Sequence, residues 1–152
     1  MELETPEIAL RLGAATLCGS VIGLNRDMRN KPIGMRTLAL VGLGAAVVTV
    51  AAVHYHGLDA QPDALSRVVQ GVIQGVMAGI SFIGAGVILR DAREHSVEGL
   101  TTAATVWVTA ALGIACGLAA WATVAVAMAL SLFVLIGIPW IEKLIGRRDG
   151  GD

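Results

Sequence analysis

The sequence predicts an all-α protein: a polytopic membrane bundle of five transmembrane helices, with its N-terminus outside and its C-terminus in the cytoplasm. Of the 152 residues, 55% are hydrophobic and 15% are charged, a composition outside the range of soluble domains. Apolar stretches long enough to cross a bilayer lie at residues 6–24, 37–55, 68–89, 100–117 and 120–140.

Lysine and arginine gather at one set of helix ends. That set holds Arg26, Arg29, Lys31, Arg36, Arg90, Arg93, Lys143, Arg147 and Arg148, whereas the opposite set holds only Arg67. Because positively charged flanks stay in the cytoplasm, this asymmetry fixes the predicted orientation and requires an odd number of spans.

The first span contains Glu7 and Arg11, whose spacing of four pairs them on one helix face at the membrane boundary. Acidic residues stand where a signal peptide carries positive charge, so we expect the first helix to be retained. The link from Asn25 to Arg36 contains Pro32 and Gly34, which favour a type I turn. A short, ordered, basic hairpin is therefore predicted between the first two helices.

The third span carries two adjacent stripes of small and polar residues. Glycines recur every four positions beside a row of polar side chains, and small residues at this spacing let another backbone approach closely. The glycines at this spacing are Gly71, Gly75 and Gly79, with Gln70, Gln74, Met77 and Ser81 beside them, and Gly84 and Gly86 near the end of the span add further capacity for close packing or bending. Since glutamine in hydrocarbon needs a partner, we predict that this helix is central and the most buried.

The chain is uncharged from Leu100 to Ile141, about twice the ~20 residues that cross a bilayer once. Two helices with a return near Gly117 are predicted. The first carries a threonine stripe and Trp107, which we expect to pack against other helices. The second is apolar all round, with Trp121 and Trp140 at its ends, and should be the least buried. Residues 1–141 thus form the predicted transmembrane domain, and 142–152 a polar cytoplasmic tail.

The two predicted cytoplasmic loops are the candidate site for a partner or ligand. Their residues are Arg26, Asp27, Lys31, Arg36 and Thr37 in the first loop, and Arg90, Glu98, Thr101 and Thr102 around the second. Guanidinium groups could bind phosphate or carboxylate here, or they could only set topology and touch anionic lipid. We predict that Arg26 or Arg36 lies near Glu98 or Asp27. Glu98 could alternatively cap the fourth helix.

No catalytic residue, cofactor or metal site is predicted, because no Asp, Glu or Lys lies in the middle of any span. His54, His56 and Asp59 have irregular spacing for a metal site and suit an interfacial role better. Cys18 and Cys116 should differ in depth by roughly 15 Å, too far for a disulfide. The basic residues flank helices and form no face for nucleic acid.

Three segments resemble the MgtC/SapB family: Gly19 to Val48, Gly79 to Arg90 and Gly99 to Gly117. The positions that match the family motifs are Gly23, Arg26, Asp27, Lys31, Pro32, Gly34, Arg36, Thr37, Gly79, Phe82, Gly84, Ala85, Gly86, Gly99, Leu100, Thr101, Thr102, Ala103, Trp107, Gly113 and Gly117. Asn25 stands where the family usually has Glu, which weakens an acidic site in the first loop. The chain also lacks the cytoplasmic ACT-like domain of longer members, so a short, SapB-like member is expected.

The resemblance implies a bacterial inner-membrane protein that is not an enzyme. It implies a regulator linked to magnesium homeostasis, or to adaptation to low magnesium and intracellular stress, with a role related to virulence in some members. Such a protein would act on a membrane protein complex, of which the ATP synthase is one candidate, and could pair with a second copy of itself. The alternative is a magnesium transporter or channel that uses the polar stripes of the third and fourth helices.

Overall fold

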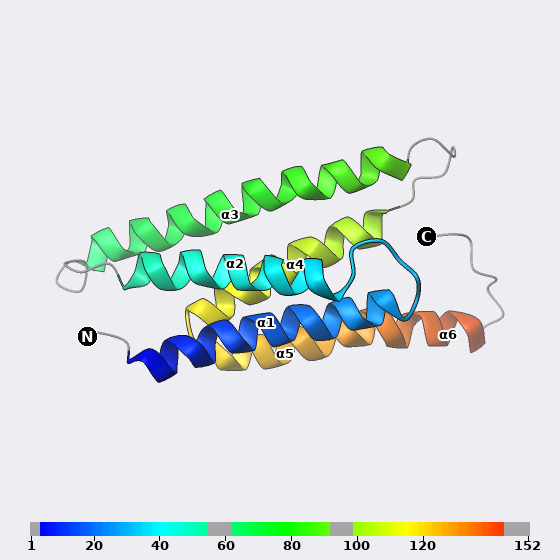
Figure 1. Cartoon of the computed structure of the whole chain (residues 1–152), viewed down its shortest axis with the longest axis horizontal. Helices are drawn as coiled ribbons and strands as arrows, with labels where there is room; N and C mark the ends of the chain where they lie inside the picture. The colour runs from blue at the N-terminus through cyan, green and yellow to red at the C-terminus, as the bar shows by residue number, and fades with distance from the viewer. Residues whose placement is uncertain (1–3, 55–61, 92–98, 145–152) are drawn as a thin grey trace.

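The computed structural model describes residues 4–54, 62–91 and 99–144, without the side chains of residues 62, 89–91, 142 and 143. Within these ranges five helices are long and apolar enough to span a membrane, which confirms the predicted number. The elements are α1 (Thr5–Asp27), α2 (Met35–Val53), α3 (Pro62–Asp91), α4 (Leu100–Gly117), α5 (Trp121–Leu132), the π-helical turn η2 (Phe133–Gly137) and α6 (Ile138–Leu144). α1 begins at one end of the bundle and α6 finishes at the other (Figure 1).

Helix boundaries follow local chemistry. α3 begins at Pro62, earlier than the predicted residue 68. Proline suits the first helical turn, and Asp63 beside it favours the positive end of the helix dipole. The return between α4 and α5 falls just after Gly117, with Ala119 at a φ of 56°.

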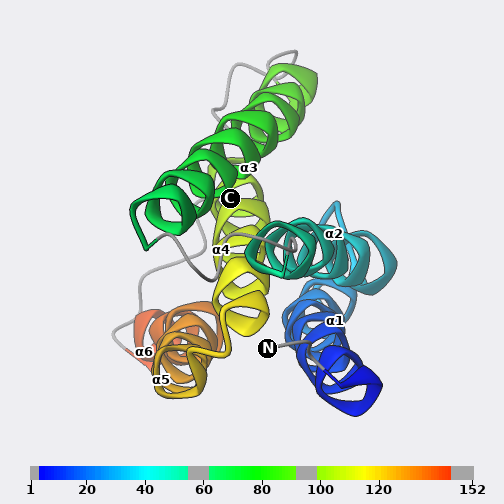
Figure 2. The same cartoon turned by 90° about the vertical axis from the view of Figure 1, so that its left-hand side faces the viewer.

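α4 is the central helix. It lies between the α1–α2 pair and the α5–α6 arm, while α3 packs along a different side (Figure 2). Of its membrane-length window 56% is buried, against 6% for α3. The prediction that the third helix is the most buried is therefore wrong for the single chain. The last span is also 6% buried, as exposed as predicted, and Val124 is the buried residue of α5.

Glycines on α1, α2 and α4 explain why these three helices form the centre. A Cβ at Gly19 would overlap the backbone of Leu38, and one at Gly23 would overlap that of Met35. A Cβ at Gly42 would lie 2.6 Å from the Ala15 carbonyl oxygen, too close to be accommodated. We call these glycines, together with Gly113 and Gly117 of α4, the closed glycine seam. The close approach that the third helix was expected to make is made here instead.

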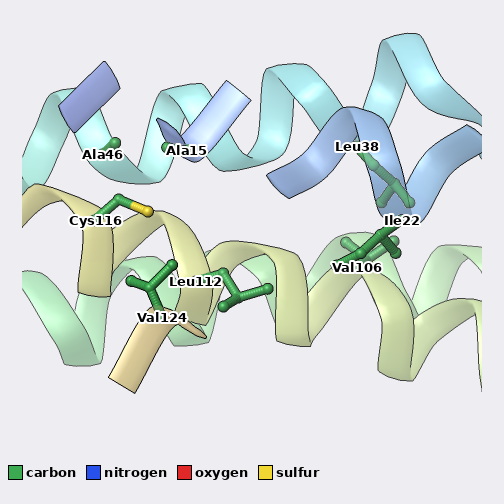
Figure 3. Packing of buried hydrophobic residues seen from close by; sticks show 8 residues of the cluster. All are labelled: Ala15, Ile22, Leu38, Ala46, Val106, Leu112, Cys116 and Val124. Atoms are coloured by element: carbon green, nitrogen blue, oxygen red, sulfur yellow. The ribbon is translucent and has the colours of Figure 1, made fainter. Parts of the chain in front are cut away.

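The buried apolar residues fill the space around this seam. Figure 3 shows side chains of α1, α2, α4 and α5 meeting along α4. The cluster consists of Ala15, Ile22, Leu38, Ala46, Val106, Leu112, Cys116 and Val124. Three of these eight residues are leucine or isoleucine, so α1, α2 and α4 are held both by close backbone approach at the seam and by packing of side chains around it.

The last span is not one continuous α-helix. Its π-helical turn η2 is closed by a hydrogen bond from the Ile138 N–H to the Phe133 carbonyl. Pro139 follows directly, and a proline inside a helix lacks the N–H donor and crowds the carbonyl four residues before it. The wider turn accommodates that crowding.

Candidate partner-binding site at the basic end

The end of the bundle that carries the hairpin of residues 28–34 and the start of α4 holds the candidate site; we call it the basic end. Arg26, in the last turn of α1, is only 4% exposed. Its Nη2 atom donates hydrogen bonds to the Thr102 hydroxyl and, at 3.3 Å, to the Pro32 carbonyl. One guanidinium therefore joins α1, the hairpin and the first turn of α4. Its Nε atom is buried and has no hydrogen-bond partner.

The side chain of Asp27, next to Arg26 in the sequence, connects the two ends of the hairpin. Its carboxylate accepts a hydrogen bond of 2.9 Å from the Met35 N–H, one of the unpaired donors at the start of α2. A Cβ at Gly34 would overlap this carboxylate. Any side chain at position 34 would thus displace the group that caps α2.

The hairpin is strained rather than a simple type I turn. Asn30 and Ile33 have φ values of 52° and 61°. For a β-branched residue such as Ile33 this conformation is unusual and costs on the order of 1–3 kcal/mol. The type I prediction is wrong, because its third position requires a negative φ. Packing of the Ile33 side chain against the buried cluster offsets the strain.

The start of α4 is shaped by Gly99, which has a φ of 90° that L side chains rarely adopt. The Gly99 carbonyl accepts the first helical hydrogen bond, from Ala103 at 2.8 Å. This entry turns Thr102 inward, where it is 3% exposed, and leaves Thr101 exposed. Arg26 meets the inward threonine.

The remaining predicted site residues lie around this core without joining it. Lys31, Arg36 and Thr37 are exposed, and none makes a side-chain hydrogen bond or ion pair with another residue that the structure describes. Arg90 belongs to α3, but its side chain is not described, and Glu98 lies outside the described residues.

The predicted ion pair at the basic end therefore has a mixed outcome. Neither Arg26 nor Arg36 pairs with Asp27, whose carboxylate instead serves the α2 N–H group. The half of the prediction that concerns Glu98 lies outside the described residues. The hydrogen bond from Arg26 to Thr102 nevertheless brings the end of α1 to the start of α4.

At the opposite end of the bundle, Glu7 pairs with Arg11 as the spacing of four predicts. Sequence reasoning missed the second contact of Arg11, in which Nη1 donates to the Gly117 carbonyl at 2.9 Å. Carbonyls at a helix C-terminus are the negative end of its dipole, so the guanidinium is well placed there.

The contact of Arg11 with Gly117 also corrects the predicted depths of the two cysteines. The end of α4 lies beside the second turn of α1, so Cys116 lies closer to the level of Cys18 than the helix rise predicted. The Cys18 and Cys116 side chains interact across α1 and α4, although a depth difference of roughly 15 Å had been predicted from helix rise. Both are free thiols. Of His54, His56 and Asp59, for which an interfacial role was expected, the last two lie outside the described residues.

α3 turns its glycine and glutamine stripes away from the rest of the chain. Cβ atoms at Gly71, Gly75, Gly79 and Gly86 would meet nothing within 4 Å. Gln70 and Gln74 are exposed beside them. We call the surface formed by Gln70, Gly71, Gln74, Gly75 and Gly79 the open α3 face. The contact of α3 with α4 lies elsewhere, at Gly84, which is buried against Ala103.

The polar stripe of α4 does not meet the open α3 face. Thr105 and Thr109 are buried, and each hydroxyl donates to a carbonyl one turn earlier in α4, at 2.6 and 2.8 Å. The methyl group of Thr109 lies beside Gly42 of α2. α3 packs instead against the side of α4 that carries Ala110 and Ile114, and the predicted packing residue Trp107 is 48% exposed. Within the described residues, the two polar stripes therefore point in different directions.

Comparison with known proteins relates nearly the whole chain to one family. Residues 12–144 match the model of the MgtC family. The chain is 40% identical to Protein SrpB of Synechococcus elongatus, over 95% of this chain and 82% of that protein. It is 38% identical to Protein SapB of Bacillus subtilis (93% and 60%) and 41% identical to Protein MgtC of Salmonella typhimurium (72% and 42%). The chain thus spans less than two thirds of SapB and MgtC. No solved structure matches it.

Proposed function

The chain belongs to the MgtC family of membrane proteins, and from this premise we propose that it is a non-enzymatic regulator that binds another membrane protein through the open α3 face. Its location would be the bacterial inner membrane, with the basic end in the cytoplasm, as the distribution of lysine and arginine favours. The process would be magnesium homeostasis or adaptation to low magnesium, with any part in virulence following from that.

The observation that carries this proposal is the combination of open glycines and exposed glutamines on a membrane-length helix. Gly71, Gly75 and Gly79 leave a strip where a second backbone can approach closely. Gln70 and Gln74 are exposed beside this strip, and lipid tails offer their amides no hydrogen bond. A helix from another protein would supply both the packing and the hydrogen bonds. A second copy of this chain or a larger complex such as the ATP synthase would meet that need.

The basic end would add a cytoplasmic contact to this intramembrane one. Lys31 and Arg36 are exposed and unpaired within the described residues, so they are available to acidic groups of a partner. Arg26 and Asp27 would hold the hairpin that presents them. Their role would be positional, since each already serves a contact within the chain.

Site-specific photocrosslinking in bacterial membranes tests the proposal. A photoreactive residue at position 74 should give a discrete adduct, whereas the same residue at position 126 should give none above background. Val126 is a matched control because it is also exposed in a membrane-length span, Trp121–Ile141, but has no glycine or glutamine within four residues on either side. Co-expressing two differently tagged copies tells a self-adduct from a foreign one.

The crosslink should depend on the glycine strip and should matter to the cell. Gly75→Leu is expected to abolish the adduct at position 74 and to impair growth in low magnesium while the protein level stays unchanged. Equal adducts at positions 74 and 126, or a Gly75→Leu variant with full activity, would overturn the proposal.

The transporter alternative has less support. A polar path through one chain would need the glutamines of α3 and the threonines of α4 to line the same space. Thr109 instead lies beside Gly42 of α2, and the hydroxyls of Thr105 and Thr109 both donate to carbonyls within α4.

A further inference from the structure

A cavity of about 380 Å³ lies at the basic end, apart from the open α3 face and from the Arg26 contacts. It is lined by Arg29 of the hairpin and by Ile136, Gly137, Pro139 and Trp140 of the last span. This volume falls in the range of pockets that hold small ligands, ~300–1,000 Å³. The chain therefore has room for a ligand between two segments more than 100 residues apart.

The irregular turn of the last span forms one wall of this cavity. A Cβ at Gly137 would lie 2.9 Å from the Phe133 ring, so that ring packs on the glycine backbone from the side that a side chain would occupy. Pro139 continues the wall with no N–H group to satisfy. The last span therefore lines the cavity with Ile136, the Gly137 backbone and the rings of Pro139 and Trp140, none of them a charged side chain.

The chemistry of the walls is that of a membrane interface. Among the described residues of the lining, Arg29 is the charged one, and it makes no ion pair with any described residue. Trp140 is 65% exposed, at the end of the span where an amphipathic ring meets the headgroup region. The other walls are apolar. A guanidinium binds two phosphate oxygens side by side, and an indole N–H can donate to a third.

The α5–α6 arm makes limited contact with the rest of the described chain. α5 packs on α4 and only slightly on α1, and Leu135 of η2 lies against the buried cluster. Within the described residues, the cavity separates Arg29 of the hairpin from the end of the arm. A lipid at the edge of the bundle could occupy this space.

We propose that this cavity binds one anionic phospholipid from the surrounding bilayer, with its phosphodiester at Arg29 and Trp140 and an acyl chain against Ile136. The bound lipid fastens the α5–α6 arm to the hairpin. Basic pockets between transmembrane helices at the cytoplasmic side are a recognised form of lipid headgroup site. The inference does not rest on the open α3 face or on any partner protein.

Native mass spectrometry of the full-length protein tests the assignment. Protein exchanged into phosphatidylcholine nanodiscs is titrated with phosphatidylglycerol and released for mass measurement. The wild type should retain one phosphatidylglycerol in preference to phosphatidylcholine. Arg29→Gln should weaken that retention roughly tenfold, the size expected on losing a charge-assisted hydrogen bond.

Lys31→Gln is the matched control, because it removes the same charge from the same hairpin but does not line the cavity. It should lower retention by no more than the few-fold that one surface charge supplies. Trp140→Leu, at an exposed position, should weaken retention without changing net charge.

Three outcomes would overturn the proposal. The first is equal retention of the two lipids. The second is an equal loss in Arg29→Gln and Lys31→Gln, which would mean general surface attraction. The third is displacement of the lipid by millimolar inorganic phosphate in an Arg29-dependent way, which would assign the cavity to a soluble anion.

Discussion

Two sets of glycines in this protein share one sequence pattern and have opposite surroundings. Gly19 and Gly23 of α1, four residues apart, touch the backbone of α2 so closely that neither can carry a side chain. Gly71 and Gly75 of α3, also four apart, face open space. A small residue every four positions therefore permits close packing, but it does not say whether a helix of the same chain uses that surface.

The two sets of glycines should also differ in their effect, because one set should affect the stability of the fold and the other the association with a partner. The closed seam brings α1, α2 and α4 together within one chain and should govern whether the bundle forms. The open α3 face adds little to that bundle, since only 6% of its span is buried. Its glycines should govern what the folded protein binds.

The largest expected effect is that of Gly23→Leu compared with Gly75→Leu. A leucine at position 23 must overlap the Met35 backbone, and overpacking of a tight contact costs about 1–3 kcal/mol or more. We expect Gly23→Leu to lower the free energy of unfolding in detergent by at least roughly 3 kcal/mol, and Gly75→Leu to change it by less than about 1. Gly13→Leu is a control on α1, because a Cβ at Gly13 meets nothing within 4 Å. Similar losses at positions 23 and 75 would break the distinction between the two sets.

A smaller effect is expected where the closed seam ends at the basic end. Thr102→Val keeps the shape of the side chain but removes the acceptor for Arg26 Nη2, leaving a buried guanidinium less well satisfied. A lost partner of a buried charged donor costs about 1–3 kcal/mol, so the unfolding free energy should fall by that amount. Thr101→Val, one residue away and exposed, should have almost no effect. If the two valine variants unfold alike, Arg26 does not depend on Thr102.

The last prediction concerns magnesium transport, where we expect no effect of the protein. Magnesium gives up its water reluctantly and is usually held by carboxylates with retained waters, and no carboxylate lies deep in the five spans. Purified protein in liposomes should therefore admit no more magnesium than empty liposomes, measured with an enclosed magnesium-sensitive dye. Saturable uptake that Gln74→Leu abolishes would make the open α3 face part of a pore and not a docking surface.

The spans could be predicted because hydrophobicity and length alone determine them. All five appear within a few residues of their predicted places, apart from the early start of α3 at Pro62. The pairing of Glu7 with Arg11 could also be predicted from the sequence, because it depends on the geometry of a single helix.

What could not be predicted is how the helices face each other. The glutamines of α3 suggested a central helix because they need hydrogen-bond partners, yet the pattern could not say that they face away from the rest of the described chain. Charge alone predicted that Asp27 pairs with an arginine, whereas its carboxylate accepts a hydrogen bond from the backbone N–H of Met35. The positive φ of Ile33 has no sequence signal either, because it is imposed by the packing of that side chain.

The unequal lengths of α3 and α4 have a consequence for the membrane itself. With 18 residues, α4 spans about 27 Å, whereas the 30 residues of α3 reach about 45 Å. A bilayer that surrounds both helices must become thinner beside α4. α3 must tilt, or its ends must project from the bilayer. We expect the thinnest point to lie above the turn at residues 118–120, directly over Arg11. Headgroups and water drawn down there would hydrate its guanidinium, so a thicker bilayer should strain this end of the protein first.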